Sequence, residues 1–197
     1  MRIISELLIT ALYTVFAQNL VLSTGLGMSE AIRVSTKPGT FGRFAMMISG
    51  FSVVTSAICS LIDSISAISS MPYAGRDAIY AAVLTAVYLV AAAVLHFAFG
   101  SSKKVMGTLG IAALNTLVLA VPHINHSAAY SFAGSIGSGI GAGIAFVLAA
   151  ALIRTGSQKL AENEDIPDVF KGTPSMFIYV AMLSLAFAGF TDSNIFG

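Results

Sequence analysis

The stretch AAYSFAGSIGSGIGAGIAFVLAAALI, residues 128–153, decides the fold class of this chain. It contains no Asp, Glu, Lys or Arg, and about 20 mostly apolar residues are enough for a helix to cross the hydrocarbon core of a bilayer. Within it, small residues recur four apart, Gly137 with Gly141 and Gly139 with Gly143, and this spacing lets helix backbones approach closely. We therefore predict a transmembrane helix that lies at the centre of the protein or at a subunit contact.

The rest of the chain has a similar composition. Of its 197 residues, 56% are apolar and 10% are charged, whereas roughly 25% of the residues in an ordinary soluble domain are charged. A soluble domain could not cover its surface with so few charges, and the length predicts about one domain. Ten Lys and Arg against nine Asp and Glu leave a formal charge of +1. No basic field exists to hold nucleic acid, so we expect no such partner.

Six apolar runs are long enough to cross a bilayer as helices, and charged, Pro or polar clusters bound them. They cover residues 4–26, 44–62, 78–99, 105–121, 128–153 and 174–190. We therefore predict an all-α, polytopic membrane protein in which residues 1–197 form a single integral membrane domain with six transmembrane helices. Glu6 interrupts the first run, which continues past the small residue Ala17, so we expect no cleaved signal peptide.

Lys and Arg are distributed unevenly between the two sides of such a bundle. Alternating connections place Arg2 and Arg76 on one side and eight others on the opposite side: Arg33, Lys37, Arg43, Lys103, Lys104, Arg154, Lys159 and Lys171. Because basic residues in short loops stay in the cytoplasm, we predict a plasma-membrane protein with both termini outside. The single cysteine, Cys59, then lies near the outer surface, and it excludes a disulfide or a four-thiolate metal site within this chain.

A short motif recurs in the first and fourth runs. AQNLVL at residues 17–22 is echoed by ALNTLVL at residues 113–119. Three spans reverse the direction of the chain, so the echo predicts two inverted three-helix repeats of about 1–99 and 100–197.

Asn19 and Asn115 stand inside these echoed segments and would place amides at membrane depth. An unpaired polar group there costs roughly 2 to 7 kcal/mol. The two amides either support broken helices at a central site or form a hydrogen bond that joins helices. Gly25 and Gly27 favour a break in the first span.

Other polar residues have simpler interpretations. His123 and His126 are three apart in an outer connection, a spacing that could hold a metal ion, but the sequence places no thiol or acidic residue beside them. We interpret them as interfacial side chains and predict no metal site. An acidic run on the cytoplasmic side is interpreted as a solvated face that could dock a soluble partner; it comprises Glu162, Glu164, Asp165 and Asp168.

Several segments together carry a resemblance to a known family. They are NLVL at residues 19–22 followed by Gly27, Val34 and Ser35; ICSLID at 58–63; Asn115; and IPDVFKGTP at 166–174, which leads into LAFAGF at 185–190. They resemble the small six-span membrane subunits of the Rnf ion-translocating oxidoreductase and of the Na⁺-translocating NADH:quinone reductase (Na⁺-NQR). The closing segment is most similar to the A subunit of Rnf, and the resemblance covers nearly the whole chain.

The resemblance implies a pair of oppositely oriented subunits that hold one [2Fe–2S] cluster between their central half-helices, each giving two cysteines. Electrons cross the membrane through this cluster while Na⁺ or H⁺ is moved. In this sequence the two ligand positions fall on Ser29 and Thr116, and Cys59 matches a family cysteine that is not a ligand. A Ser or Thr hydroxyl stays protonated near neutral pH and does not replace a thiolate. We therefore predict that the chain has no cluster and no other cofactor of its own.

Two main hypotheses for the function stay open. In the first, the chain is a membrane subunit of an Rnf-like or NQR-like assembly and provides a scaffold or an ion path. Its partners are then the lipid bilayer, a homologous membrane subunit of opposite topology or a second copy, and redox subunits. In the second, a divergent paralogue transports an ion or small solute through a central site formed by Asn19, Ser29, Asn115 and Thr116. A structural role beside another membrane protein is a third hypothesis. No catalytic constellation is recognisable, so at most the chain is a non-catalytic subunit of a translocase.

Overall fold

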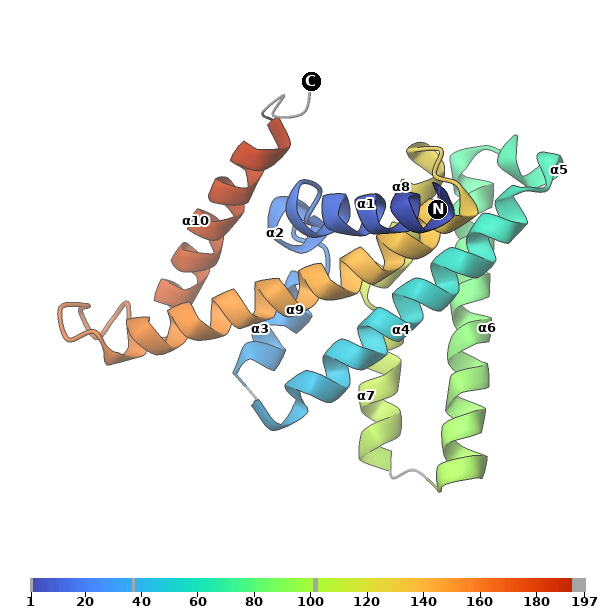
Figure 1. Ribbon diagram of the computed structural model, residues 1–197. Helices are drawn as coiled ribbons and strands as arrows, with labels where there is room; N and C mark the ends of the chain where they lie inside the picture. The colour runs from blue at the N-terminus through green and yellow to red at the C-terminus, as the bar shows by residue number, and fades with distance from the viewer. Residues whose placement is uncertain (1, 37, 101–102, 193–197) are drawn as a thin grey trace.

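Every regular element of the computed structural model is a helix within residues 2–36, 38–100 and 103–192, which are the residues that the structure describes (Figure 1). In chain order they are α1 (Arg2–Phe16), α2 (Leu20–Thr24), α3 (Met28–Ser35), α4 (Pro38–Asp63), α5 (Ser66–Ser69), α6 (Tyr73–Phe99), α7 (Lys103–Ala113), α8 (Thr116–Ser127), α9 (Phe132–Glu162) and α10 (Thr173–Asp192).

Five stretches are long and apolar enough to cross a membrane: Arg2–Thr24, Gly39–Asp63, Tyr73–Phe97, Val105–Ser127 and Phe132–Glu162. They coincide with the first five predicted spans. The sixth predicted span falls on α10, whose apolar stretch Thr173–Gly189 is shorter. The chain is therefore an all-helical, polytopic membrane protein, as predicted. The first of the five stretches is divided between α1 and α2, and the fourth between α7 and α8.

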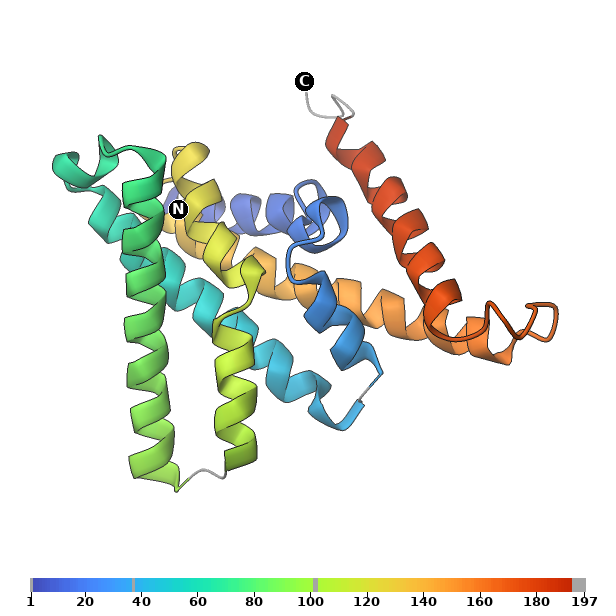
Figure 2. The ribbon, with the colours of Figure 1, turned by 180° about the vertical axis from the view of Figure 1, so that it is seen from behind.

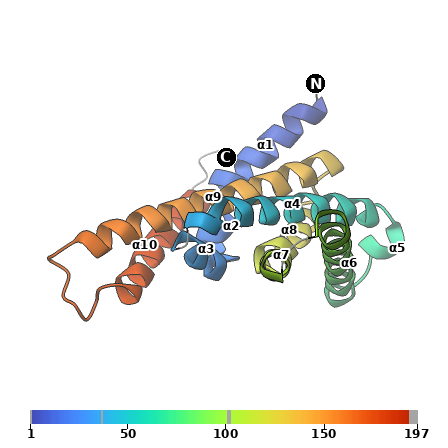
Figure 3. The same cartoon turned by 90° about the horizontal axis from the view of Figure 1, so that it is seen from below.

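The long helix α9 packs between α1 and α4, and Figure 3 shows the three helices side by side. Gly137 and Gly141 face α1, where a Cβ atom added at Gly141 would lie 2.6 Å from the carbonyl oxygen of Ala11. Gly139 and Gly143 face α4 in the same way. Each pair of glycines four residues apart thus packs against a different helix. Because glycine has no side chain, the backbones of α1 and α4 can both approach α9 closely.

The apolar core surrounds the two half-helices α2 and α8. Its fully buried members include Val21, Leu22, Leu117, Val118 and Phe146. These side chains come from α2, α8 and the middle of α9. Packing against protein, rather than against lipid, therefore holds both half-helices in place.

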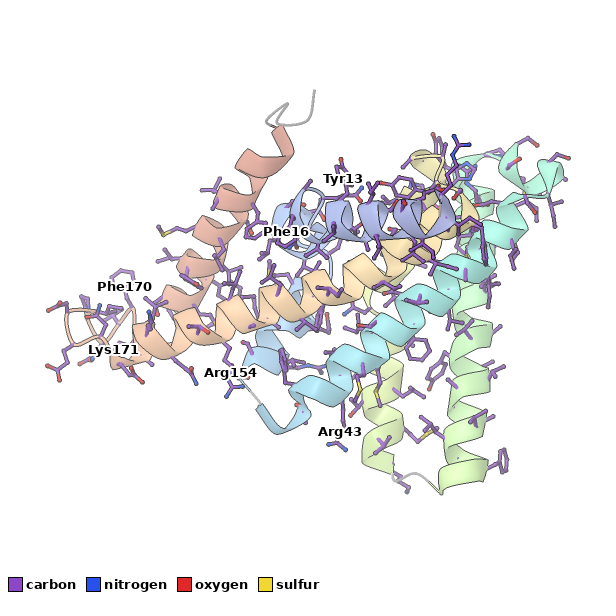
Figure 4. The ribbon with its side chains drawn as sticks, viewed as in Figure 1. Tyr13, Phe16, Arg43, Arg154, Phe170 and Lys171 are labelled. Carbon is purple, nitrogen blue, oxygen red and sulfur yellow. The ribbon has the colours of Figure 1, made fainter. Side chains whose placement is uncertain are left out.

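The ends of the helices lie on different sides of the molecule. In Figure 1 the start of α4 and the neighbouring ends of α6 and α7 lie on the lower side, the α9–α10 connection lies at the left end, and the α4–α6 and α8–α9 connections lie at the upper right. Arg43 and Arg154 point out on the lower side, and Lys171 lies in the α9–α10 connection (Figure 4). Lys37, which the charge count also placed there, lies outside the described residues. Which side faces the cytoplasm stays a prediction.

A broken helix followed by two long helices occurs twice along the chain. In the first half α1 and α2 precede α4 and α6, and in the second half α7 and α8 precede α9 and α10. Figure 2 shows α6 and α10 at opposite ends of the molecule, with α10 contacting α2 and α9. The inverted relation between the halves, with bounds near 1–99 and 100–197, stays a prediction.

Candidate functional site

Asn19 begins the half-helix α2, directly after the break that follows Phe16. Its Oδ1 accepts a hydrogen bond from the backbone N–H of Leu22 at 3.2 Å, and its Nδ2 donates to the carbonyl oxygen of Val15 at 2.9 Å. The side chain is fully buried. One amide thus joins the last turn of α1 to the first turn of α2 and satisfies backbone groups that the break leaves free.

Asn115 occupies the corresponding position at the start of α8. Its Oδ1 accepts a hydrogen bond from the backbone N–H of Leu117 at 2.8 Å, and the side chain is buried. Its Nδ2 has no hydrogen-bond partner among the described residues. Each break is therefore capped by an asparagine, but only the second keeps a free amide donor.

The two breaks meet where Gly27 approaches α8. The backbone N–H of Gly27 donates to Thr116 Oγ1 at 3.0 Å. Gly27 has a φ of +76°, and a Cβ atom there would lie 2.9 Å from Asn115 Oδ1, so both the conformation and the contact require glycine. Because α3 begins at Met28 and α8 begins at Thr116, the positive ends of two helix dipoles lie together at this point.

The structure brings together only part of the predicted central site. Asn115 and Thr116 both contact Gly27. Ser29 is further along the chain, exposed on α3. Asn19 is buried, and its side-chain amide bonds to backbone groups within its own break.

The side chains at this point do not fit a [2Fe–2S] cluster, which needs ionised sulfur ligands. The two positions that the resemblance assigns to ligands carry the hydroxyl of Ser29 and Thr116 Oγ1, which accepts a hydrogen bond from Gly27. The one thiol of the chain, Cys59, is buried in the last turns of α4. Among the described residues, no group of three or more His, Cys, Asp and Glu side chains could hold a metal ion.

A cavity of about 530 Å³ lies where α4 and α8 end and α9 begins. This cavity could not be recognised from the sequence, although Ser56, Ser60 and Asp63 recur at the spacing of one helix face. Its polar lining includes Ser56, Ser60, Asp63, Asn125, His126 and Ser135. Tyr130 also lines it, outside the membrane-spanning stretches, and burial, with a smaller effect of Tyr13, raises the pKa of Tyr130. The Tyr130 hydroxyl therefore stays neutral.

Asp63 belongs to a chain of hydrogen bonds at the edge of this cavity. Its Oδ2 accepts from the Tyr80 hydroxyl at 2.6 Å and lies 3.3 Å from His126 Nδ1. Arg76 Nη1 contacts His126 Nε2. Because a guanidinium can only donate, Nε2 must accept, and the imidazole proton belongs on Nδ1, facing Asp63.

Arg76 itself is 3% exposed, which is unusual for an arginine. It also donates to the carbonyl oxygen of Ser69 at 3.2 Å and lies over the ring of Tyr73 at 5.0 Å. These contacts hold its charge in place, with the ring of His126 between it and Asp63.

A second cavity, of about 340 Å³, lies beside Thr116 and extends to Tyr80 and Asp77. Tyr80 lines this smaller cavity, and its hydroxyl binds Asp63, which lines the larger one. The bond between Tyr80 and Asp63 therefore stands between the meeting point of the breaks and the cavity at the end of α4.

The two histidines contact different carboxylates. His123 Nδ1 lies 2.9 Å from Asp77 Oδ1, whereas His126 faces Asp63. These acidic partners were not foreseen from the sequence because they come from the end of α4 and the start of α6. The two rings therefore have separate partners rather than a common ligand set.

The acidic run after α9 lies on the surface. Glu162, Glu164 and Asp165 are exposed, and Asp168 pairs with Lys171 at 3.0 Å. An exposed ion pair of this kind contributes about 0 to 1 kcal/mol. Nothing in this geometry distinguishes the run from a solvated face.

The chain is similar to known membrane subunits over most of its length. The family model described as "Rnf-Nqr subunit, membrane protein" matches residues 7–192. The chain is 28% identical over 192 residues to the E subunit of the Na(+)-translocating NADH-quinone reductase of Pseudoalteromonas translucida, covering 92% of this chain and 95% of that protein. It is 28% identical over 194 residues to the A subunit of the ion-translocating oxidoreductase complex of Colwellia psychrerythraea, covering 95% and 97%.

A third relative shows a shorter match at higher identity. The A subunit of the proton-translocating ferredoxin:NAD(+) oxidoreductase complex of Clostridium ljungdahlii is 38% identical over 79 residues, which cover 40% of each chain. The names of these three relatives describe subunits that belong to ion-translocating oxidoreductases.

Proposed function

Because the chain belongs to the Rnf-Nqr family of membrane protein subunits, we propose that it is a membrane subunit of an ion-translocating oxidoreductase of the Rnf or Na⁺-NQR type. In this proposal it carries no [2Fe–2S] cluster of its own. It serves as a scaffold or an ion path, and its partner subunits carry the redox centres.

The contact between Gly27 and Thr116 is the main support for a subunit without a cluster. Thr116 stands where the resemblance sets a sulfur ligand, yet its hydroxyl accepts a hydrogen bond from the start of α3 at 3.0 Å. The side chain thereby joins the two breaks. Its neutral oxygen supplies no negative charge to bind ferric iron.

The proposal extends to the surroundings of the chain. We place it in the plasma membrane with both termini outside, and we expect a homologous membrane subunit of opposite topology, or a second copy, beside it. The large apolar side chains of α10 support contact with lipid or with such a subunit; Phe177, Ile178, Met182 and Leu185 are all exposed.

Purification of the native complex through a tag on this chain tests the proposal. We expect flavin or iron–sulfur subunits to co-purify, and we expect iron analysis and electron paramagnetic resonance of the intact complex to find only the clusters that its partner subunits hold when they are purified without this chain. The matched control carries Ser29→Cys and Thr116→Cys, which restore both thiols. An additional [2Fe–2S] cluster in the intact wild-type complex would refute the cluster-free part, and purification without any redox subunit would refute the assembly.

The two cavities favour transport of an ion or small solute as a second candidate function. They lie on either side of the Tyr80–Asp63 bond, and the smaller one reaches Thr116. Proteoliposomes that contain only this chain would distinguish the candidates. Uptake without any electron donor or acceptor supports an independent transporter, whereas uptake that needs the redox partners supports a role within the complex.

A further inference from the structure

His126, near the end of α8, lies between two charged side chains, and each of its ring nitrogens contacts a different helix. Its Nδ1 lies 3.3 Å from Asp63 Oδ2 at the end of α4, and its Nε2 contacts Arg76 Nη1 at the start of α6. Asp63 Oδ2 also accepts a hydrogen bond from the Tyr80 hydroxyl at 2.6 Å. One imidazole therefore joins the ends of three helices.

The number of protons on this ring decides whether both of its contacts can exist. A guanidinium only donates hydrogen bonds, so Nε2 must be the unprotonated nitrogen of a neutral ring. A second proton would place an N–H on Nε2 opposite the N–H groups of Arg76 and would add a positive charge beside the guanidinium. The neutral ring can therefore contact both Arg76 and Asp63, whereas the imidazolium can keep only the contact with Asp63.

Arg76 has little freedom to withdraw from a charged ring. Its side chain is 3% exposed, donates to the carbonyl oxygen of Ser69 at 3.2 Å and lies over the ring of Tyr73 at 5.0 Å. These contacts hold the guanidinium on the α6 side. When the two side chains repel each other, the ring of His126 and the end of α8 that carries it have to move.

The other titratable groups around His126 respond differently. Tyr130 lines the same cavity, and its hydroxyl stays neutral because burial raises its pKa. His123, one turn earlier on α8, has Asp77 as its partner at 2.9 Å and contacts no guanidinium among the described residues. A proton on His123 makes this pair an ion pair and strengthens it. Acid therefore weakens one contact between α8 and α6 and strengthens the other.

We propose that His126 is a pH-sensitive switch between α8 and α6. The neutral ring holds the end of α8 to Arg76, and protonation breaks this contact while Asp63 retains the ring. Histidine is the side chain whose charge ordinarily changes between about pH 5 and 8. The start of α8 is held separately, by the hydrogen bond from Gly27 to Thr116. The switch therefore controls one of the two ends of this half-helix, and the proton acts as a signal.

His126 also lines the cavity of about 530 Å³. Movement of its ring away from Arg76 therefore changes the wall of this cavity. The response needs only residues of this chain, so it can be measured without redox partners and does not depend on the proposed function.

Nuclear magnetic resonance of the full chain, labelled with ¹⁵N-histidine and purified in detergent, measures the protons on the ring. The chain has three histidines, and the variant His126→Gln identifies the signal of His126. At about pH 8 we expect the proton of the neutral ring on Nδ1, which is the less common tautomer of free histidine. At about pH 5 we expect protons on both nitrogens.

Electron paramagnetic resonance between two spin labels measures the movement of α8. In a Cys59→Ala background, Ala74→Cys in α6 and Ala128→Cys directly after α8 provide exposed positions for the labels. We expect a longer mean distance between the labels at about pH 5 than at about pH 8.

Four variants separate this switch from a general effect of acid. Glutamine at position 126 can still accept a hydrogen bond from Arg76 but takes up no proton, so His126→Gln should abolish the change in distance, whereas His123→Gln should keep it. An amide at position 76 can donate to the neutral ring and accept from the protonated one. Arg76→Gln should therefore hold the labels together at both pH values, whereas Arg76→Lys, which only donates, should keep the change.

Each result decides the proposal. A proton on Nε2 of the neutral ring would overturn it, as would a ring that stays neutral at about pH 5. Protonation of His126 without any change in the distance would also overturn it. A change in distance that persists in His126→Gln would assign the response to another group, and this comparison holds even if the Arg76 variants fail to fold.

Discussion

The Tyr80 hydroxyl donates to Asp63 Oδ2 across 2.6 Å, and the two side chains line different cavities. Tyr80 comes from α6 and Asp63 ends α4. Tyr80 is 1% exposed, so the phenol has no access to solvent in place of this partner. The bond therefore fixes the carboxylate and links a side chain of one cavity to a side chain of the other.

Replacement of Tyr80 by Phe removes this donor and keeps the ring. A hydrogen bond to a charged group contributes about 1.5 to 3 kcal/mol, so we expect a loss of that size in stability, measured by thermal or chemical unfolding in detergent. Tyr13→Phe is the control, because Tyr13 is 48% exposed on the outward face of α1 (Figure 4). Equal stability of the two variants would show that the bond to Asp63 contributes nothing.

Alanine substitutions at Gly25 and Gly27 distinguish the cost of backbone strain from the cost of side-chain overlap. Both have a φ of +76°, but a Cβ atom at Gly25 meets nothing within 4 Å, whereas one at Gly27 lies 2.9 Å from Asn115 Oδ1. Alanine in this conformation costs roughly 1 to 2 kcal/mol, and overlap in a packed region adds about 1 to 3 kcal/mol. In unfolding measurements, we expect Gly25→Ala to lower the stability by the cost of the backbone strain alone. We expect Gly27→Ala to lower it by the cost of the strain and the cost of the overlap together. Equal losses would mean that Asn115 moves aside freely.

The close packing of α9 can be tested with two glycines in long helices. A Cβ atom at Gly141 would lie 2.6 Å from the carbonyl oxygen of Ala11, but one at Gly189 in α10 meets nothing within 4 Å. We expect Gly141→Ala to destabilise the protein by about 1 to 3 kcal/mol. Gly189→Ala should be neutral or stabilise it by up to about 1 kcal/mol through helix propensity. Retention of full stability by Gly141→Ala would contradict the tight contact between α1 and α9.

The sequence predicted the spans and the close packing of α9 because both depend on local patterns. A charge-free run sets the position of a helix, and glycines four apart mark where it can approach a neighbour. Asn19 and Asn115 were candidates because an amide at membrane depth needs a partner. Their position as caps follows from structure, since each cap depends on where the preceding helix ends.

The larger cavity could not be predicted because its groups come together only in three dimensions. Asp63, Arg76 and His126 end or begin different helices and are far apart in the sequence. Burial is equally hidden: the sequence placed Cys59 near the end of a span, where it lies in α4, but did not reveal that the thiol faces the interior and is 1% exposed. The position of a residue in the sequence predicts how far along a transmembrane helix it lies, whereas packing against other helices decides whether its side chain is buried.

The orientation of the chain needs a probe other than Cys59. We expect the buried Cys59 thiol to stay unlabelled in the folded protein. In a Cys59→Ala background, Ser70→Cys and Asn163→Cys place exposed thiols in the α4–α6 and α9–α10 connections. A membrane-impermeant maleimide should label the first in intact cells and the second only after permeabilisation, because basic residues keep the α9–α10 side in the cytoplasm. The reverse pattern would invert the proposed topology.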